Sequence, residues 1–188
     1  MQHSVRLFLL CAAFMLTACS ASTTERLNLP PLKTVEQVEL PRYMGTWYEI
    51  ASFPQSFQRG CVGTSATYSL RNDGKVSVVN RCFNQSLDGE ERVATGRARV
   101  VDDSNAKLEV SFFGPFWGDY WIIELGAEYD YAVVAAPGRD YLWILSRSPQ
   151  MEQDLLDSLL QDLSANHQFD IDRLQFTQQP SAASAEQD

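Results

Sequence analysis

Histidine and cysteine are scarce in this sequence, with two and four copies among 188 residues. His3 falls in an N-terminal leader, so His167 is the one histidine of the mature chain. No His/Cys cluster has the spacing of metal ligands, and no serine lies in a Gly-x-Ser-x-Gly nucleophile motif. The sequence therefore argues against an enzyme and predicts neither a metal nor a cofactor.

Basic residues are also few. Lys and Arg number 15 against 24 Asp and Glu, which gives a formal net charge of −9. An acidic surface repels phosphates, so nucleic acid and anionic membrane surfaces are poor partners for this chain.

No apolar run is long enough to span a bilayer as a helix. The run Leu7–Leu16 has ten residues, against the roughly 20 that a transmembrane helix needs. It follows Arg6, as in a secretory signal. Leu16-Thr17-Ala18-Cys19 resembles the lipobox of bacterial lipoproteins, which implies cleavage before Cys19 and acylation of its thiol and new amino group. An ordinary signal peptide, with Cys19 an incidental thiol, is the alternative.

Ser20 follows this cysteine. In bacterial lipoproteins an aspartate there tends to retain the protein at the inner membrane, so the resemblance implies the outer membrane, facing the periplasm. We divide the chain into four parts. They are a signal peptide that is removed (1–18), an acylated N-terminus and tether (19–40), a folded domain (41–179) and a disordered tail (180–188).

The region 46–147 predicts a succession of short strands. Apolar and polar residues alternate between turn sequences such as Asn72-Asp73-Gly74 and Pro137-Gly138. Short loops without helices join antiparallel neighbours, and closing such a meander removes both edges. The sequence thus predicts an all-β, eight-stranded up-and-down barrel, with its long first connection, 54–61, at the barrel mouth. We expect strands at 46–53, 62–71, 75–83, 91–101, 106–113, 119–126, 130–136 and 140–147.

One α-helix is predicted after the barrel. Pro149 suits a first helical position, and acidic residues fall between apolar ones that recur at helical spacing. We expect the helix to pack outside the barrel, with a short returning strand at 173–177. The apolar positions are Met151, Leu155, Leu156, Leu159, Leu160 and Leu163.

Strand parity predicts which side chains face the barrel interior. Trp47 and Arg147 would stack at one end, in a cation–π contact worth roughly 0.5–2 kcal/mol; a plain core tryptophan and a surface arginine are the alternative. Small residues on one strand leave room for a cavity that holds one small ligand, and a filled core is the alternative. The predicted lining consists of Ala94, Gly96, Ala98, Leu108, Val110, Phe112, Tyr141 and Trp143.

Cys61 and Cys82 are an even pair in an exported chain, which favours a disulfide. The hairpin that turns at 72–74 places Cys82 opposite residue 64 or 65, so Cys61 overhangs its partner by three or four residues. The bridge forms only if the chain curls at Gly60 or Gly63. Two free thiols, one of which could be a reactive group, are the alternative.

Glu49 shares the inward parity of Trp47, where a lone carboxylate is costly. Either Arg97 or Arg99 pairs with it, or the strand bends and carries Glu49 to the solvated rim. Both arrangements are consistent with the sequence.

Together these features resemble the lipocalin family, in which Gly45-x-Trp47 would open the first strand and Arg147 would close the eighth. The resemblance covers residues 40–178. It implies a cup that is closed at the Trp47 end, is open at the other, and binds a fatty acid or lysophospholipid with its headgroup near Arg59. Finer blocks, which resemble the bacterial outer-membrane lipocalins, are Trp47–Ala51, Phe57–Gly60, Val110–Phe116 and Tyr141–Arg147.

The predicted function is to hold single-chain lipids beside the outer membrane, for storage or transport in maintaining the cell envelope. The predicted partners are a fatty acid or lysophospholipid and, through acyl chains on Cys19, the membrane itself. A homodimer is a further candidate assembly. The alternatives are an enzyme acting on a lipid, as in a few lipocalin relatives, and a scaffold that docks a protein partner.

The anchor is tested by replacing its acylated residue. We expect Cys19→Ser to release the protein into the soluble fraction, because no thiol remains to carry an acyl chain. Membrane fractionation measures this, and a variant that sediments with the outer membrane as the parent does would contradict the anchor.

Overall fold

The structure is a computed structural model that describes residues 29–181. Every element below belongs to one compact unit that begins at Pro31. The predicted signal peptide, the acylation site at Cys19 and most of the predicted tail lie outside the described residues.

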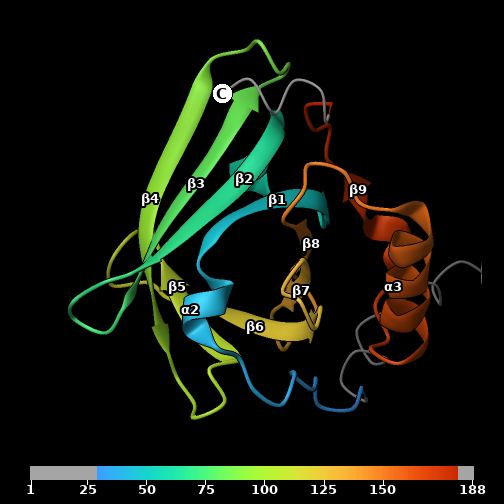
Figure 1. The fold of residues 1–188 in the computed structure, drawn as a ribbon. Coiled ribbons are helices and arrows are strands. Elements are labelled where there is room, and N and C mark those ends of the chain that lie inside the picture. The colour runs from blue at the N-terminus through green and yellow to red at the C-terminus, as the bar shows by residue number, and fades with distance from the viewer. Residues whose placement is uncertain (1–28, 182–188) are drawn as a thin grey trace, which may run out of the picture. The chain divides into compact units, whose positions relative to one another are not determined.

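Eight antiparallel strands form a closed barrel, which confirms the predicted architecture (Figure 1). Each strand pairs with the next along the chain, and β1 pairs with both β2 and β8 to close the ring. The observed ends lie within two residues of the predicted ones. The strands are β1 (Gly45–Ser52), β2 (Cys61–Leu70), β3 (Val76–Asn84), β4 (Glu91–Val100), β5 (Lys107–Ser111), β6 (Gly118–Leu125), β7 (Tyr131–Ala135) and β8 (Leu142–Ser146).

The barrel is tight at one end and spread at the other. β4 pairs with β5 from Arg97 to Val100, whereas its first half pairs with β3. Likewise β1 pairs with β2 only as far as Tyr48 and Ser65, and the two strands then separate. As a result, β2, β3 and β4 extend together away from the remaining strands (Figure 1).

A bulge in β2 brings the two cysteines together. Cys61 pairs with Asn84, but the register shifts between Val62 and Ser65, where Gly63 adopts a positive φ of 60°. The Cα atoms of Cys61 and Cys82 lie 5.4 Å apart, and the two residues form a disulfide. The predicted bridge is confirmed, and the curl that it requires occurs at Gly63.

The helix α3 (Gln153–Ala165) packs on the outside of the barrel, as predicted. Its buried leucines contact outward-facing residues of β7 and β8, such as Val133 and Ile144. The predicted start was wrong, because Pro149 lies four residues before the first helical residue and Glu152 is the N-cap. No helix within the described range 29–181 is long and apolar enough to cross a membrane.

The returning segment after α3 forms the two-residue strand β9 (Gln175–Phe176), preceded by the 3₁₀ turn η2 (Ile171–Arg173). β9 pairs with Ala51 and Ser52 at the far end of β1. Beyond it, Gly63 N donates to Gln178 O over 2.7 Å. The segment therefore fills the gap that opens between β1 and β2.

The second half of the predicted tether packs against the barrel. Leu32 and Val38 are buried, and Val35 N donates a hydrogen bond to Ile122 O over 3.1 Å. This segment leads into the short helix α2 (Leu40–Tyr43), which the sequence pattern did not predict. The compact unit thus includes residues from the region assigned to the tether.

Arg147 closes the end of the barrel next to α2. Its Cζ atom lies 3.8 Å from the centroid of the Trp47 ring, so the predicted stacking is present. Gly45 allows this approach, because a Cβ atom there would lie 3.2 Å from Arg147 Nη1 and the residue has a φ of +96°. The guanidinium also donates hydrogen bonds to the carbonyl oxygens of Arg42, Tyr43, Met44, Thr46 and Tyr129.

We expect Arg147→Ala to lower the free energy of unfolding by about 2–4 kcal/mol, since it exposes one indole face and leaves carbonyl groups without a donor. Urea unfolding measures this loss, and a double-mutant cycle with Trp47→Phe isolates the coupling. Arg81→Ala, which removes an exposed ion pair with Glu91, is the matched control and should change stability little. Zero coupling between Arg147 and Trp47 would contradict the stack.

Candidate functional site

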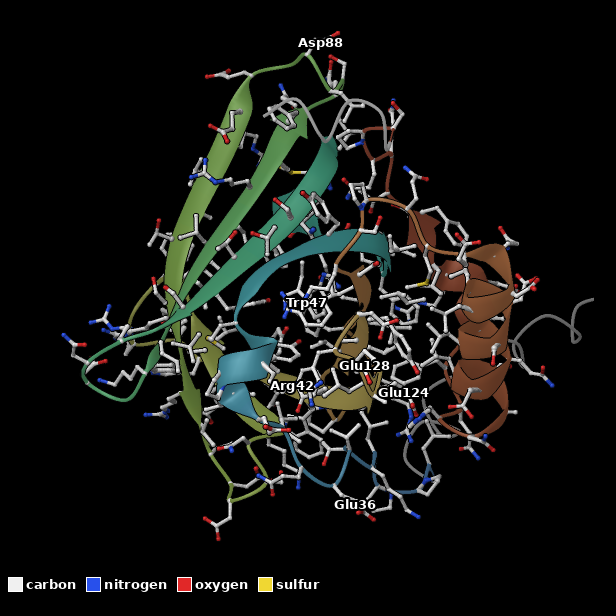
Figure 2. All side chains as sticks on the ribbon, in the orientation of Figure 1. Glu36, Arg42, Trp47, Asp88, Glu124 and Glu128 are labelled. Carbon is white, nitrogen blue, oxygen red and sulfur yellow. A yellow bond between two sulfur atoms is a disulfide. The ribbon has the colours of Figure 1, made fainter. Side chains whose placement is uncertain are left out.

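Side chains fill the half of the barrel interior next to α2. Trp47 is fully buried there and points into the ring of strands (Figure 2). Its Nε1 donates to Tyr43 O over 2.9 Å, and the two rings lie 4.9 Å apart. We call Tyr43, Trp47, Tyr68 and Tyr120 the floor of the barrel.

The three tyrosines of the floor share a chain of hydrogen bonds. The Tyr43 and Tyr120 hydroxyls lie 2.8 Å apart, and Tyr120 donates to the Tyr68 hydroxyl over 3.1 Å. Burial raises the pKa of Tyr68 to about 12 and raises the pKa of Tyr43 and Tyr120 well above the ordinary value. The floor is therefore neutral at physiological pH, and it presents polar hydroxyl groups inside an apolar cup.

The predicted lining residues divide between the filled half and an accessible half. Ala98 and Leu108 are buried in the cluster that surrounds the floor. Val110, Phe112 and Trp143 pack at its edge and remain partly exposed, and we call these three side chains the apolar wall. The predicted lining residues are therefore neither all buried nor all exposed.

The small residues of β4 leave less room than their sizes suggest. At Gly96 an added Cβ atom would lie 2.8 Å from Phe112 Cδ1, so the Phe112 ring already covers the glycine. Ala98 is buried, which leaves Ala94, exposed on the same face of β4, as the small residue with open space before it. Tyr141 lies at the rim and stacks on Trp143, with ring centroids 5.7 Å apart.

A cavity of about 490 Å³ lies at the mouth, which we define as residues 54–62 with the returning segment 175–178. The 3₁₀ turn η1 (Ser56–Gln58) of the first connection lies on one side and β9 on the other. Glu49 and Ser52 of β1 complete the lining. Most of the side chains that line this cavity are polar.

Glu49 is buried at this entrance, with 6% of its surface exposed. Among residues 29–181 no arginine contacts the carboxylate, so the first alternative drawn from the sequence is wrong. The second is correct in part: the register of β1 shifts between Glu49 and Ala51 and the side chain lines the mouth cavity, but it is buried there and not solvated. Neutral donors bind it instead: Ser52 Oγ at 3.1 Å, Gln58 Nε2 at 2.7 Å and Thr177 Oγ1 at 2.6 Å. These contacts tie the first connection and the returning segment to β1.

Arg92 holds the first connection from the opposite wall. Its guanidinium donates to Phe57 O at 3.2 Å and to Arg59 O at 3.1 Å. Arg59 is exposed and lines the mouth cavity. Within residues 29–181, neither arginine forms an ion pair with a carboxylate, so both are free to attract an anion.

Sequence reasoning missed Arg92, Gln58 and the floor tyrosines. Arg92 shares the strand parity of Ala94 and Ala98, so parity alone could have placed it inside. Gln58 acts as a bridge, since it accepts a hydrogen bond from Trp143 Nε1 over 3.3 Å and donates to Glu49. Its role depends on how the first connection folds back, which strand patterns do not describe.

Comparison with known proteins gives consistent matches over nearly the whole chain. Residues 38–179 match the family model described as a lipocalin-like domain. The chain is 40% identical to an outer membrane lipoprotein Blc of Citrobacter freundii, over 91% of this chain and 94% of that one. The protein of the same name from Vibrio cholerae is 42% identical, over 89% and 98%.

The fold comparison points the same way. Insecticyanin from the tobacco hornworm Manduca sexta superposes with a TM-score of 0.65, covering 82% of this chain and 87% of its own. At 24% sequence identity this likeness concerns the fold alone.

Removal of the Glu49 carboxylate tests its role at the mouth. We expect Glu49→Ala to lower the free energy of unfolding by about 1–3 kcal/mol, because buried donors lose their acceptor. The amide of Thr177, which donates to Ile50 O over 2.9 Å, should then exchange faster with deuterium. Glu109→Ala, which removes an ion pair with Arg99 on another strand, is the control and should leave that amide unchanged. Unaltered protection of the Thr177 amide in Glu49→Ala would contradict the role of Glu49 in holding the returning segment to β1.

Proposed function

Because this chain belongs to the lipocalin-like domain family, we propose that it binds one single-chain lipid, a fatty acid or a lysophospholipid, in the upper half of its barrel. The observation that carries the proposal is the accessible apolar wall of Val110, Phe112 and Trp143 above a filled floor. One closed end and one open end suit a ligand with a single apolar tail and a polar head.

The two ends of such a ligand meet different surroundings. The tail would lie against Phe112 and Trp143, and the head would remain at the mouth beside Arg59 and Arg92. A carboxylate or phosphate there gains from two cations that carry no acidic partner among the described residues. This local pair of arginines offsets the repulsion expected from the negative charge of the whole chain.

Apolar burial supplies enough free energy for useful affinity. Sixteen buried methylenes contribute about 13 kcal/mol, at ~0.8 kcal/mol for each. Lost freedom of the ligand and desolvation of its headgroup cost several kcal/mol. The binding free energy that results is about −8 kcal/mol, which corresponds to a dissociation constant in the micromolar range.

The proposed location is the outer membrane, with the barrel on the periplasmic side and acyl chains on Cys19 as the anchor. The lipobox-like sequence before Cys19 supports this, and so do relatives that are named outer membrane lipoproteins. There the protein would store or carry single-chain lipids in maintaining the envelope. Binding, and not catalysis, is the proposed activity.

Tryptophan fluorescence tests the ligand directly. We expect a long-chain fatty acid or lysophospholipid to change the emission saturably, at micromolar concentrations below micelle formation, because the tail contacts Trp143. Trp143→Phe should remove most of the change.

A matched pair of substitutions on β4 locates the ligand inside the barrel. Ala94→Phe fills the accessible half and should weaken binding at least tenfold, whereas Val93→Phe, whose side chain is half-exposed on the other face of the strand, should bind as the parent does. Equal binding by both variants, or no saturable response by the parent to either lipid, would contradict the proposal.

A further inference from the structure

Three side chains that are far apart in the sequence meet outside the barrel, between β6 and the end of α3. Glu124 lies on β6, Asp162 lies in the last turn of α3, and His167 follows the helix. Figure 2 shows Glu124 on the side of the barrel that faces α3. Their ligand atoms all lie within 4.8 Å of one another, and each side chain is partly buried.

A bulge in β6 turns Glu124 toward this position. The register with β7 shifts between Ile122 and Glu124, so the regular alternation of the strand is broken. Ile122 and Leu125 pack in the barrel interior, whereas Ile123 packs against α3. Glu124 therefore points to the same outer side as Ile123.

Two hydrogen bonds fix the backbone of His167. Arg139 Nε donates to His167 O over 2.7 Å, and His167 N donates to Asp162 O over 3.3 Å. The imidazole is 12% exposed, and its Nε2 atom lies 2.8 Å from Glu124 Oε1 and 3.4 Å from Asp162 Oδ2. One nitrogen atom thus faces two carboxylates.

Hydrogen bonding alone satisfies this arrangement poorly. Nε2 carries at most one proton, so it can donate to only one of the two carboxylates. Asn166 Nδ2 donates to Asp162 Oδ1, but Asp162 Oδ2, which faces the imidazole, lies beyond the usual range of a charge-assisted hydrogen bond from Nε2. Asp162 also lies in the last turn of α3, where the helix dipole disfavours a negative charge and where no basic residue is present.

The pKa of a neighbouring tyrosine also reflects the negative charge around these three side chains. The pKa of Tyr131 is raised by burial and further by the charges of Glu124, Asp130 and Asp162. A cation between the three side chains would relieve the repulsion between the carboxylates of Glu124 and Asp162.

We propose that Glu124, Asp162 and His167 form a binding site for a divalent transition-metal ion, and that Zn²⁺ suits these donors best. Zn²⁺ binds imidazole nitrogen and carboxylate oxygen at about 2.0–2.2 Å, so tetrahedral donors lie about 3.3–3.5 Å apart. The Nε2–Oδ2 distance of 3.4 Å already fits, and the Nε2–Oε1 distance of 2.8 Å must open slightly. The imidazole donor favours Zn²⁺ over Mg²⁺ or Ca²⁺, which prefer oxygen.

Three protein ligands leave a fourth position for water. The ion would join the end of α3 to β6, and it lies outside the barrel interior where the lipid is proposed to bind. Its expected effect is therefore on the stability of the native state, through binding to the folded chain alone.

Isothermal titration calorimetry with ZnCl₂ tests the site, on the untagged mature protein in a non-chelating detergent. We expect one Zn²⁺ per chain and a melting temperature that rises with the Zn²⁺ concentration. His167→Gln and Glu124→Gln should each weaken binding at least tenfold. Asp157→Asn, which alters an exposed acid on the same helix, is the matched control and should bind as the parent does.

Two further experiments test whether Zn²⁺ binds specifically at this site. Mg²⁺ titrated in place of Zn²⁺ should give no one-to-one binding, which separates the site from general attraction to an acidic protein. The single histidine of the mature chain allows a measurement on the parent alone: Zn²⁺ should slow modification of His167 by diethyl pyrocarbonate. Absence of Zn²⁺ binding by the parent, unchanged binding by His167→Gln, or modification at the same rate with Zn²⁺ would overturn the proposal.

Discussion

The contact between Arg147 and Trp47 closes one end of the barrel, and the rest of the cup depends on that closure. The chain enters β1 through a short helix whose last carbonyl groups have no partner in the sheet. Arg147 satisfies them and covers the indole with the same planar group, 3.8 Å from the ring centroid. A lysine could not do both, because it lacks the planar array of donors. With this end sealed, the tyrosines above Trp47 pack into a dry floor.

At the open end β1 and β2 separate, and their unpaired backbone groups need other hydrogen-bond partners. The returning segment enters the gap, and Gln179 Nε2 donates to both Glu49 O and Thr64 O over 2.8 Å. Glu49 then binds three neutral side chains, two of which come from the segments that border the mouth. The lining of the entrance is therefore mostly polar.

Alternation and turn chemistry predicted the eight strands because each follows from local sequence. The disulfide and the Arg147 stack could also be predicted, since strand parity and an even cysteine count constrain them. The environment of Glu49 could not be predicted, because its partners Gln58 and Thr177 lie in segments without periodicity. The open space expected at Gly96 was overestimated for a related reason: parity places residues on a face but does not show that Phe112 leans across it.

The start of α3 and the cluster around His167 show the same limit. Pro149 is a favourable first residue for a helix, yet the chain needs several more residues to leave β8 before α3 begins at Gln153. Spacing along the sequence revealed no metal site, because the three candidate ligands are brought together by a bulge in β6 and by the docking of α3.

The central claim is that a barrel sealed at the Trp47 end and open at the Arg59 end holds one single-chain lipid. Native mass spectrometry of the protein, extracted from its own membrane in a mild detergent, measures this most directly. The account predicts one adduct per chain, which on release is identified as a fatty acid or a lysophospholipid. A protein that carries no lipid, or that carries intact two-chain phospholipid in the same proportion as its membrane, would contradict it.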